Sequence, residues 1–219
     1  MNFSQIKTKY VKKPYDQIAK VYNRKHFDEK AFDPIINEFA KLLKPGAKVL
    51  DLGCGPGGET KKLLQHGFDV TSIDISPKML SLAKKNVPNG RFLEMDITKM
   101  TFPKKTFDAV WTARTLIHLP SSKLDKVLAS LNTILIDQGP VCVIVIEGQS
   151  EGLQNEPYDP SGKTKTYFHF FKDHELDQLF INHGFAIIKS KRFSLSQYQE
   201  TYLVIFARKT ASSLLDKKC

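Results

Sequence analysis

The sequence predicts an α/β fold in which a mostly parallel sheet is covered by helices on both faces. From about residue 48 onward, short apolar runs typical of strands alternate with segments of helical periodicity. The run Val141–Glu147 is rich in Val and Ile, as a parallel strand covered on both faces should be. A length of 219 residues with 41% hydrophobic residues suits one domain with a full core. Such alternation indicates βαβ units, whose ligands bind beyond the carboxyl ends of the strands.

Two helices are expected before the first strand. Pro14 suits the first turn of a helix, and apolar residues follow it at helical spacing, among them Tyr15 and Tyr22. Asp33-Pro34 starts the second helix, and Pro45-Gly46 ends it. We expect residues 1–45 to form a helical lid on the rest of the chain.

Seven strands are expected, at residues 48–52, 69–74, 91–95, 107–112, 141–147, 185–193 and 201–207. The intervening helices are expected at 59–65, from Ser76-Pro77 to about 87, from Ser121 or Ser122 onward, and from a cap at Asp173 to Gly184. Residues 46–209 would form the ligand-binding domain, and residues 210–219 a flexible tail.

The net charge of +10 admits two interpretations. Residues 1–30 hold eight Lys or Arg and three acidic residues, which is half of the total excess. A solvated lysine-rich surface is the simpler interpretation, and a basic rim that steers an anionic substrate or a nucleic acid is the other. Lysine outnumbers arginine 28 to 5, and specific nucleic-acid contacts favour arginine. A nucleic-acid partner is therefore possible but not favoured.

Neither a membrane segment nor a metal site is expected. The longest apolar run, at residues 141–146, is far too short to span a bilayer, and the polar, basic start does not resemble a signal peptide. The scattered Cys54, Cys142 and Cys219 form neither a disulfide framework nor a zinc motif. We therefore expect a cytoplasmic protein without a membrane partner.

A glycine-rich loop follows the first predicted strand. Gly53, Gly55 and Gly58 satisfy G-x-G-x-x-G, and a helix follows. Alone, this pattern also fits a nicotinamide or flavin dinucleotide. Asp51 lies two residues before the first glycine, where a carboxylate would repel a pyrophosphate. It would instead favour the ammonium and sulfonium groups of S-adenosylmethionine (SAM), which has no phosphate.

Two further acidic residues follow the next two predicted strands. Asp74 can accept hydrogen bonds from both hydroxyls of a ribose, and Asp96 can accept from an adenine amino group. Each acid also has a simpler alternative role: Asp51 can bond its own turn, Asp74 can cap a helix with Ser76, and Asp96 can be an ordinary loop residue. Three acids at the ends of three consecutive strands favour the ligand interpretation.

Four segments make the sequence resemble the class I SAM-dependent methyltransferases, over about residues 15–208. They are VLDLGCGPGG (49–58), VTSIDISPKML (70–80), FLEMDIT (92–98) and FDAVWTARTLIHLP (107–120). The C-terminal part is similar to small bacterial methyltransferases of the type 11 group. The resemblance implies a Rossmann-like, doubly wound, seven-stranded sheet of order 3-2-1-4-5-7-6 with the last strand antiparallel. Asp137-Gln138-Gly139-Pro140 replaces the family's usual Pro-Gly-Gly turn.

The resemblance also implies which residues bind SAM. The implied contacts come from Asp51, Gly53, Gly55, Asp74, Ile75, Asp96 and Ile97, and the loop residues Cys54 and Gly57 are included in the same site. Thr112, Ala113 and Arg114 would line the methionine end of the cofactor. Tyr15 and Tyr22 could close over SAM from the N-terminal helix, although such a stripe is more often packing.

The family reaction is an in-line displacement of the sulfonium methyl group by a nucleophile. SAM is already reactive, so the protein chiefly aligns the reactants and excludes water. His118 is the best candidate for a general base, although a packing or capping role is at least as plausible. Arg114 could hold an anionic acceptor, and the remaining candidates for acceptor contacts are Glu147, Tyr167 and His169.

A small-molecule methyl acceptor is the favoured hypothesis. The chain lacks the N6-adenine methyltransferase motif after the fourth strand, a Pro-Cys nucleophile, and a paired-glutamate loop of arginine methyltransferases. The alternatives are an RNA methyltransferase, suggested by the charge, and a SAM-binding protein without catalysis. We expect a monomer or a homodimer.

Overall fold

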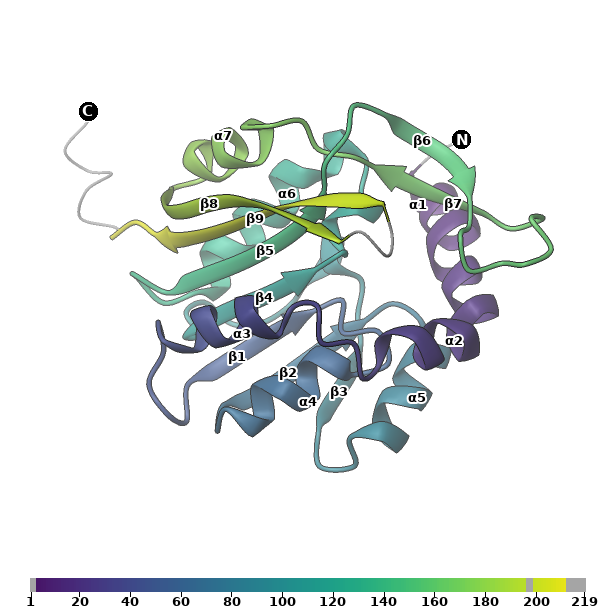
Figure 1. Cartoon of the computed structure of the whole chain (residues 1–219). Coiled ribbons are helices and arrows are strands. Elements are labelled where there is room, and N and C mark those ends of the chain that lie inside the picture. The colour runs from purple at the N-terminus through teal and green to yellow at the C-terminus, as the bar shows by residue number, and fades with distance from the viewer. Residues whose placement is uncertain (1–2, 196–198, 212–219) are drawn as a thin grey trace.

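A seven-stranded sheet forms the centre of the computed structural model, which describes residues 3–195 and 199–211 (Figure 1). Its order is β3-β2-β1-β4-β5-β9-β8. In chain order, the strands of this sheet are β1 (Lys48–Leu52), β2 (Asp69–Asp74), β3 (Arg91–Glu94), β4 (Ala109–Ala113), β5 (Pro140–Ile146), β8 (Phe185–Leu195) and β9 (Glu200–Lys209).

The predicted topology is confirmed. Counted along the chain, β8 and β9 are the sixth and seventh strands of the sheet, so the order is 3-2-1-4-5-7-6. The first five strands pair in parallel, and β9 is antiparallel to both β5 and β8. Every residue of β5 is buried, as its run of Val and Ile predicts for a strand covered on both faces.

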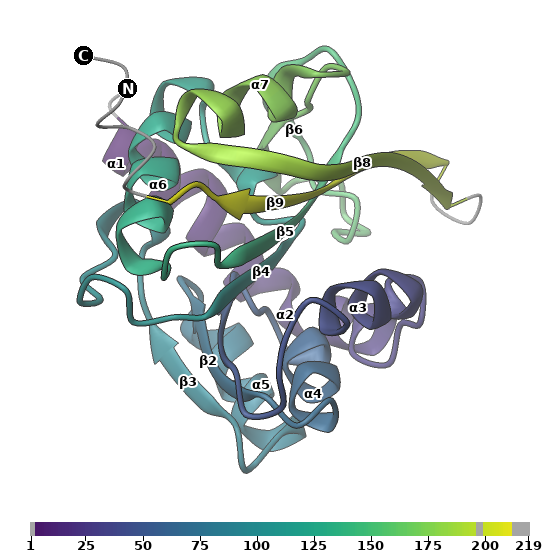
Figure 2. The same ribbon diagram turned by 90° about the vertical axis from the view of Figure 1, so that its left-hand side faces the viewer.

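Helices cover both faces of the sheet. Figure 2 shows α3 and α4 on one face and α6 on the other. The helices that follow strands are α4 (Gly58–Gln65), α5 (Pro77–Asn86), α6 (Ser121–Ile134) and α7 (Glu175–Asn182), with short 3₁₀ turns η2 (Ile97–Lys99) and η3 (Leu116–His118). Ser76 caps α5 as expected, since its hydroxyl accepts from the backbone N–H of Met79 at 3.1 Å. No helix in the described part of the chain is both long and apolar enough to cross a membrane.

The N-terminal helix starts earlier than the sequence predicts. It runs through α1 (Phe3–Lys7), the π-helical turn η1 (Thr8–Lys12) and α2 (Lys13–His26), and α3 (Asp33–Ala40) follows. Pro14 lies in the first turn of α2, as expected, but α2 directly continues the helical turns α1 and η1 that precede it. Proline lacks an N–H and interrupts the α-helical hydrogen-bond ladder, and the wider π turn lies directly before it. The added turns extend the helix beyond the carboxyl ends of the strands (Figure 1).

A two-stranded hairpin between β5 and α7 was not anticipated. β6 (Glu151–Asn155) and β7 (Lys165–His169) pair in an antiparallel sheet of their own. β7 contacts the turns η1 and η3, so the hairpin lies over the same end of the main sheet as the N-terminal helix. The acceptor-contact candidates Tyr167 and His169 therefore lie within β7, the second strand of the hairpin.

Three smaller expectations need correction or fall outside the described residues. The cap at Asp173 was wrong, because α7 begins at Glu175 after His174, which adopts a left-handed backbone conformation (φ 61°). The fourth strand begins at Ala109, and Phe107 forms only an isolated bridge. Most of the expected tail, residues 212–219, lies outside the described residues.

Candidate functional site

The glycine loop turns sharply between β1 and α4. Gly53 and Gly55 both have positive φ, at 79° and 52°. A Cβ at Gly53 would lie 2.1 Å from the Thr115 hydroxyl oxygen, so glycine is required there by both conformation and space. The backbone N–H groups of Gly53 and Cys54 both donate to the carbonyl of Ile73, which fixes the loop against β2.

Asp74 ends β2 and holds the glycine loop directly. Its carboxylate accepts from the backbone N–H of Gly55 at 2.9 Å and of Ser76 at 2.8 Å. Burial is the largest influence on this group and raises the pKa of Asp74, while these two hydrogen bonds oppose the rise. Asp74 lines the pocket described below, so its remaining lone pairs face a space where a ligand can bind.

Asp51 is buried behind the loop. It accepts a hydrogen bond of 2.6 Å from the Thr60 hydroxyl, which also lies 3.0 Å from the Ser72 hydroxyl. Burial raises the pKa of Asp51 to about 8, because the low-dielectric surroundings disfavour the charged carboxylate. This weakens the electrostatic argument that the sequence suggested for Asp51, and a contact between Asp51 and a cofactor stays a prediction.

Asp96 lies at the other end of the same row of acids. It caps η2 by accepting from the backbone N–H of Thr98 at 3.0 Å, and it forms an ion pair with Lys7 of α1. The ion pair and the capping bonds lower the pKa of Asp96 even though burial raises it. Asp96, Ile97 and Lys7 all line the pocket.

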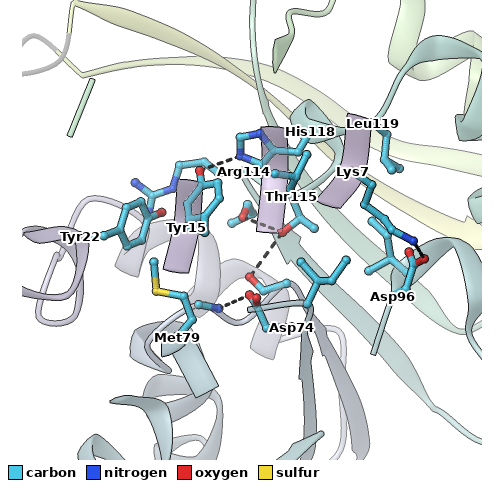
Figure 3. A pocket seen from close by; sticks show the side chains of 16 residues that line it. Lys7, Tyr15, Tyr22, Asp74, Met79, Asp96, Arg114, Thr115, His118 and Leu119 are labelled. Carbon is cyan, nitrogen blue, oxygen red and sulfur yellow. Dashed lines mark hydrogen bonds and ion pairs between the residues drawn. The ribbon is translucent and has the colours of Figure 1, made fainter. Parts of the chain in front are cut away.

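One pocket unites these features at the carboxyl ends of β1, β2 and β4. It encloses about 700 Å³ of space between protein atoms, including its opening to solvent. Figure 3 shows Tyr15, Tyr22, Arg114 and His118 on one side of it, and Lys7 with Asp96 on the other. The lining residues are Lys7, Val11, Tyr15, Tyr22, Gly53, Gly55, Asp74, Ile75, Met79, Asp96, Ile97, Ala113, Arg114, Thr115, His118 and Leu119.

His118 and Tyr15 form a hydrogen-bonded pair at the pocket wall. The His118 Nδ1 lies 2.9 Å from the carbonyl oxygen of Tyr167, and its Nε2 lies 2.7 Å from the Tyr15 hydroxyl. A carbonyl can only accept, so Nδ1 carries the proton and Nε2 accepts from the tyrosine. Burial lowers the pKa of His118 to about 4, which keeps the imidazole neutral at pH 7. The pair therefore presents a neutral base and a hydroxyl to the pocket.

Arg114 is surrounded by carboxylates. Its guanidinium lies 3.0 Å from Glu29 and 3.5 Å from Glu59, and its central carbon lies 4.8 Å above the centre of the Phe32 ring. Burial lowers the pKa of Arg114, but the surrounding acidic groups, led by Tyr22 and Glu59, raise it well above the usual value. The side chain reaches the pocket but is held by residues of the chain itself.

Several predicted site residues lie elsewhere among the described residues. Cys54 and Gly57 pack behind the loop, and Thr112 donates to the carbonyl of Leu52 at 3.0 Å. Two acceptor-side candidates also lie outside the pocket wall: Glu147 pairs with Arg192 at 2.6 Å, and His169 stacks on Phe171 with ring centres 4.2 Å apart.

Tyr167 reaches the site only through its backbone. Its hydroxyl donates to Glu151, away from the pocket wall, while its carbonyl fixes His118. No group of three or more His, Cys, Asp or Glu side chains within residues 3–195 and 199–211 is arranged to hold a metal ion.

Five lining residues had not been singled out from the sequence: Lys7, Val11, Met79, Thr115 and Leu119. Thr115 and Leu119 belong to the segment after β4 that the family resemblance covers, so that motif was the available signal. Lys7 and Val11 precede the expected helix start at Pro14, and nothing in their local sequence indicated a helix reaching the site.

The comparisons with known proteins agree with this geometry. Residues 49–139 match the methyltransferase domain family. The chain is 31% identical over 170 residues to a sterol 24-C-methyltransferase of Gibberella zeae, which covers 72% of this chain and 42% of that protein. It is 39% identical over 117 residues to 2-methyl-6-phytyl-1,4-hydroquinone methyltransferase of Synechocystis, covering 51% of this chain and 36% of that protein. The chain thus spans less than half the length of these two relatives.

A solved structure has the same fold over nearly the whole chain. It is the 1,6-didemethyltoxoflavin-N1-methyltransferase of Burkholderia thailandensis, with its acceptor and S-adenosylhomocysteine bound. The TM-score is 0.72 at 24% identity, over 90% of this chain and 87% of the other. The matched domain, the sheet order and the glycine loop with its acids agree: residues 49–139 belong to the methyltransferase domain family, and the chain has the fold of the class I SAM-dependent methyltransferases, whose cofactor is S-adenosylmethionine.

Proposed function

We propose that this chain transfers the methyl group of SAM to a small-molecule acceptor. The observation that carries the proposal is the hydrogen-bonded pair of Tyr15 and His118, which lines the same pocket as the cofactor-side acids Asp74 and Asp96. An acceptor bound beside this pair would lie next to the methionine end of the cofactor, where a methyl group can be transferred in line.

The cofactor side of the proposed site is built by the ends of β1, β2 and β3. The backbone of Gly53 and Gly55 allows close approach, Asp74 would accept from the ribose hydroxyls, and Asp96 from the adenine amino group. Ile75 and Ile97 line the same space and would pack on the base. The bound cofactor supplies the activated methyl group.

The acceptor side would be organised by the neutral imidazole of His118. Its Nε2 accepts a hydrogen bond from the Tyr15 hydroxyl, so the Tyr15 oxygen can in turn accept a hydrogen bond from an N–H or O–H of the methyl acceptor. As the acceptor loses electron density to the new bond, its proton can pass to Tyr15 while the Tyr15 proton passes to His118. The carbonyl of Tyr167 holds the ring in the required tautomer throughout.

We further propose that residues 1–45 act as the lid of a domain formed by residues 46–209. Lys7, Val11, Tyr15 and Tyr22 all lie along the N-terminal helix and line one wall of the pocket. A wall made by a helix and flanked by the β6–β7 hairpin favours a small acceptor over a nucleic acid, and it would exclude water during transfer.

The test combines cofactor binding with turnover. Calorimetry should show that the protein binds SAM and S-adenosylhomocysteine, and incubation with SAM and broad metabolite pools should release S-adenosylhomocysteine. The His118→Gln variant should bind SAM as the wild type does and lose about 100-fold in turnover, a typical loss for a proton-transfer group. SAM binding without turnover of any pool would support a non-catalytic SAM-binding protein instead. Salt-sensitive retention on RNA together with RNA methylation would support the nucleic-acid alternative.

A further inference from the structure

Arg114 is the obvious candidate for binding an anionic acceptor, but its partners come from the protein itself. Its Nη1 donates to Glu29 at 3.0 Å and lies 3.1 Å from the Nδ1 of His26. Its Nη2 lies 3.5 Å from Glu59 at the start of α4. The side chain is only 11% exposed, and Glu29 and Glu59 are 5% and 17% exposed, so water screens these charges little.

The backbone also holds Arg114 in place. The residue has a positive φ of 58° directly after β4, and its backbone N–H donates to the carbonyl of Ile144 at 2.8 Å. Its guanidinium lies against the Phe32 ring. The arginine thus joins three segments: the end of β4, the connection between α2 and α3, and the first turn of α4. Arg114 therefore has a structural role in connecting these segments, and its guanidinium is already occupied by partners within the protein.

The remaining charged side chains of the pocket also leave no cation available for an anionic acceptor. Lys7, the second cation that lines it, is paired with Asp96. Counting the lining side chains and the two glutamates on Arg114, the described residues supply two formal positive charges and four negative ones: Lys7 and Arg114 against Asp74, Asp96, Glu29 and Glu59. The cofactor carries one net positive charge, which would offset the excess negative charge of Asp74, Asp96 and Lys7. The excess negative charge of Glu29 and Glu59 over Arg114 would then remain at the acceptor side.

We propose that the acceptor is an uncharged or cationic small molecule, and that Glu29 and Glu59 exclude phosphorylated and carboxylated acceptors by neutralising Arg114. This proposal rests on the proposed function and names its substrate class. An anionic acceptor would have to displace an intramolecular glutamate from Arg114 or lie beside uncompensated carboxylates. Tyr15 and Tyr22 offer ring surfaces that suit an aromatic or cationic group.

The first experiment needs no knowledge of the acceptor. A small-molecule extract of cells is separated at pH 7 on an anion exchanger, and the retained and unretained fractions are each incubated with enzyme and methyl-tritiated SAM. We expect at least tenfold more transferred label from the unretained fraction. Equal label, or more label from the retained anions, overturns the proposal while the proposed function stands. Absence of label from both fractions, with SAM binding intact, contradicts the proposed function itself and this inference with it.

The second experiment tests the role of the glutamates. Glu59→Gln keeps the shape of the side chain but removes one charge from Arg114, so the ratio of label from retained to unretained acceptors should rise at least fivefold. The matched control is Glu38→Gln, the same change on α3, where Glu38 pairs with Lys189 and Lys191 far from the pocket. An unchanged ratio in Glu59→Gln, or an equal rise in the control, overturns the proposal. Glu29→Gln provides a second variant, and calorimetry with S-adenosylhomocysteine verifies that each variant folds.

Discussion

The two sides of the pocket are built in different ways. The proposed cofactor side comes mainly from one continuous part of the chain, residues 49–97, in which each strand ends in a glycine loop or an acid, and Lys7 of α1 joins it beside Asp96. The proposed acceptor side is assembled from distant segments: Tyr15 and Tyr22 from α2, Arg114 and His118 from the connection after β4, and the Tyr167 carbonyl from the hairpin. The cofactor side depends chiefly on backbone conformation, whereas the acceptor side depends on side chains that meet only in the folded protein.

The largest expected effect concerns the backbone of the cofactor side. Gly53→Ala places a Cβ at positive φ and 2.1 Å from the Thr115 oxygen, and we expect a loss of about 3 kcal/mol in the free energy of unfolding. Gly46→Ala is the matched control, because Gly46 also has positive φ (76°) but a Cβ there meets nothing within 4 Å. The control should lose about 1 kcal/mol in urea denaturation, for conformational strain alone. Equal losses in both variants would remove the steric part of the argument.

The next effect concerns cofactor affinity. Asp74→Ala should weaken SAM binding by about 2 kcal/mol, since it removes a carboxylate that faces the pocket and also orders the Gly55 and Ser76 backbone. Calorimetry measures this directly. Asp74→Asn, which retains one acceptor oxygen, should lie between the wild type and the alanine variant. An unchanged dissociation constant in Asp74→Ala would contradict the proposed ribose contact.

A third prediction concerns the effect of His118 on the pH dependence of the free energy of unfolding. His118 has a pKa of about 4 when folded and about 6.5 when unfolded, so the unfolded chain binds more protons between these values and stability falls on acidification. Burial raises the pKa of Asp51 to about 8 in the folded protein, above its unfolded value. The folded chain then binds more protons at this group, so its contribution to stability grows on acidification and is lost as pH rises toward 8. From pH 7 to pH 5, the wild type should lose about 2 kcal/mol more stability than His118→Gln, because the Asp51 contribution is common to both. Parallel pH profiles of the two proteins would show that His118 is not buried as a neutral group.

The smallest expected effect tests the acceptor side alone. Tyr15→Phe removes the hydroxyl that donates to His118 at 2.7 Å while keeping the ring, and we expect about a tenfold fall in kcat with unchanged SAM affinity. Tyr22→Phe is the control, since its hydroxyl is not bonded to His118 and its ring packs against Tyr15 with centres 5.7 Å apart. A tenfold loss of SAM affinity in Tyr15→Phe would place this tyrosine on the cofactor side instead.

Much of this protein was determined by local sequence. The alternation of strands and helices predicts the parallel α/β sheet, and the glycine loop and the acids at strand ends predict most of the proposed cofactor-side wall, because turn conformation and strand ends depend on residues adjacent in the chain. The order of the strands followed from the family resemblance instead. The hairpin of β6 and β7 and the extension of the N-terminal helix before Pro14 were not predictable in this way. Their residues have weak local patterns and are stabilised by contacts with distant segments.

Only the tertiary structure decided what the charged and polar candidates do. The sequence identified Arg114, Glu147 and His169 equally well as residues for an acceptor, but folding pairs Arg114 with Glu29 and Glu59, and places the other two away from the pocket. It likewise encloses Asp51 beside Thr60 and joins His118 to Tyr15, 103 residues earlier. The charge and protonation of a buried group depend on burial and on partners that folding brings within a few ångströms, and neither can be derived from spacing along the chain.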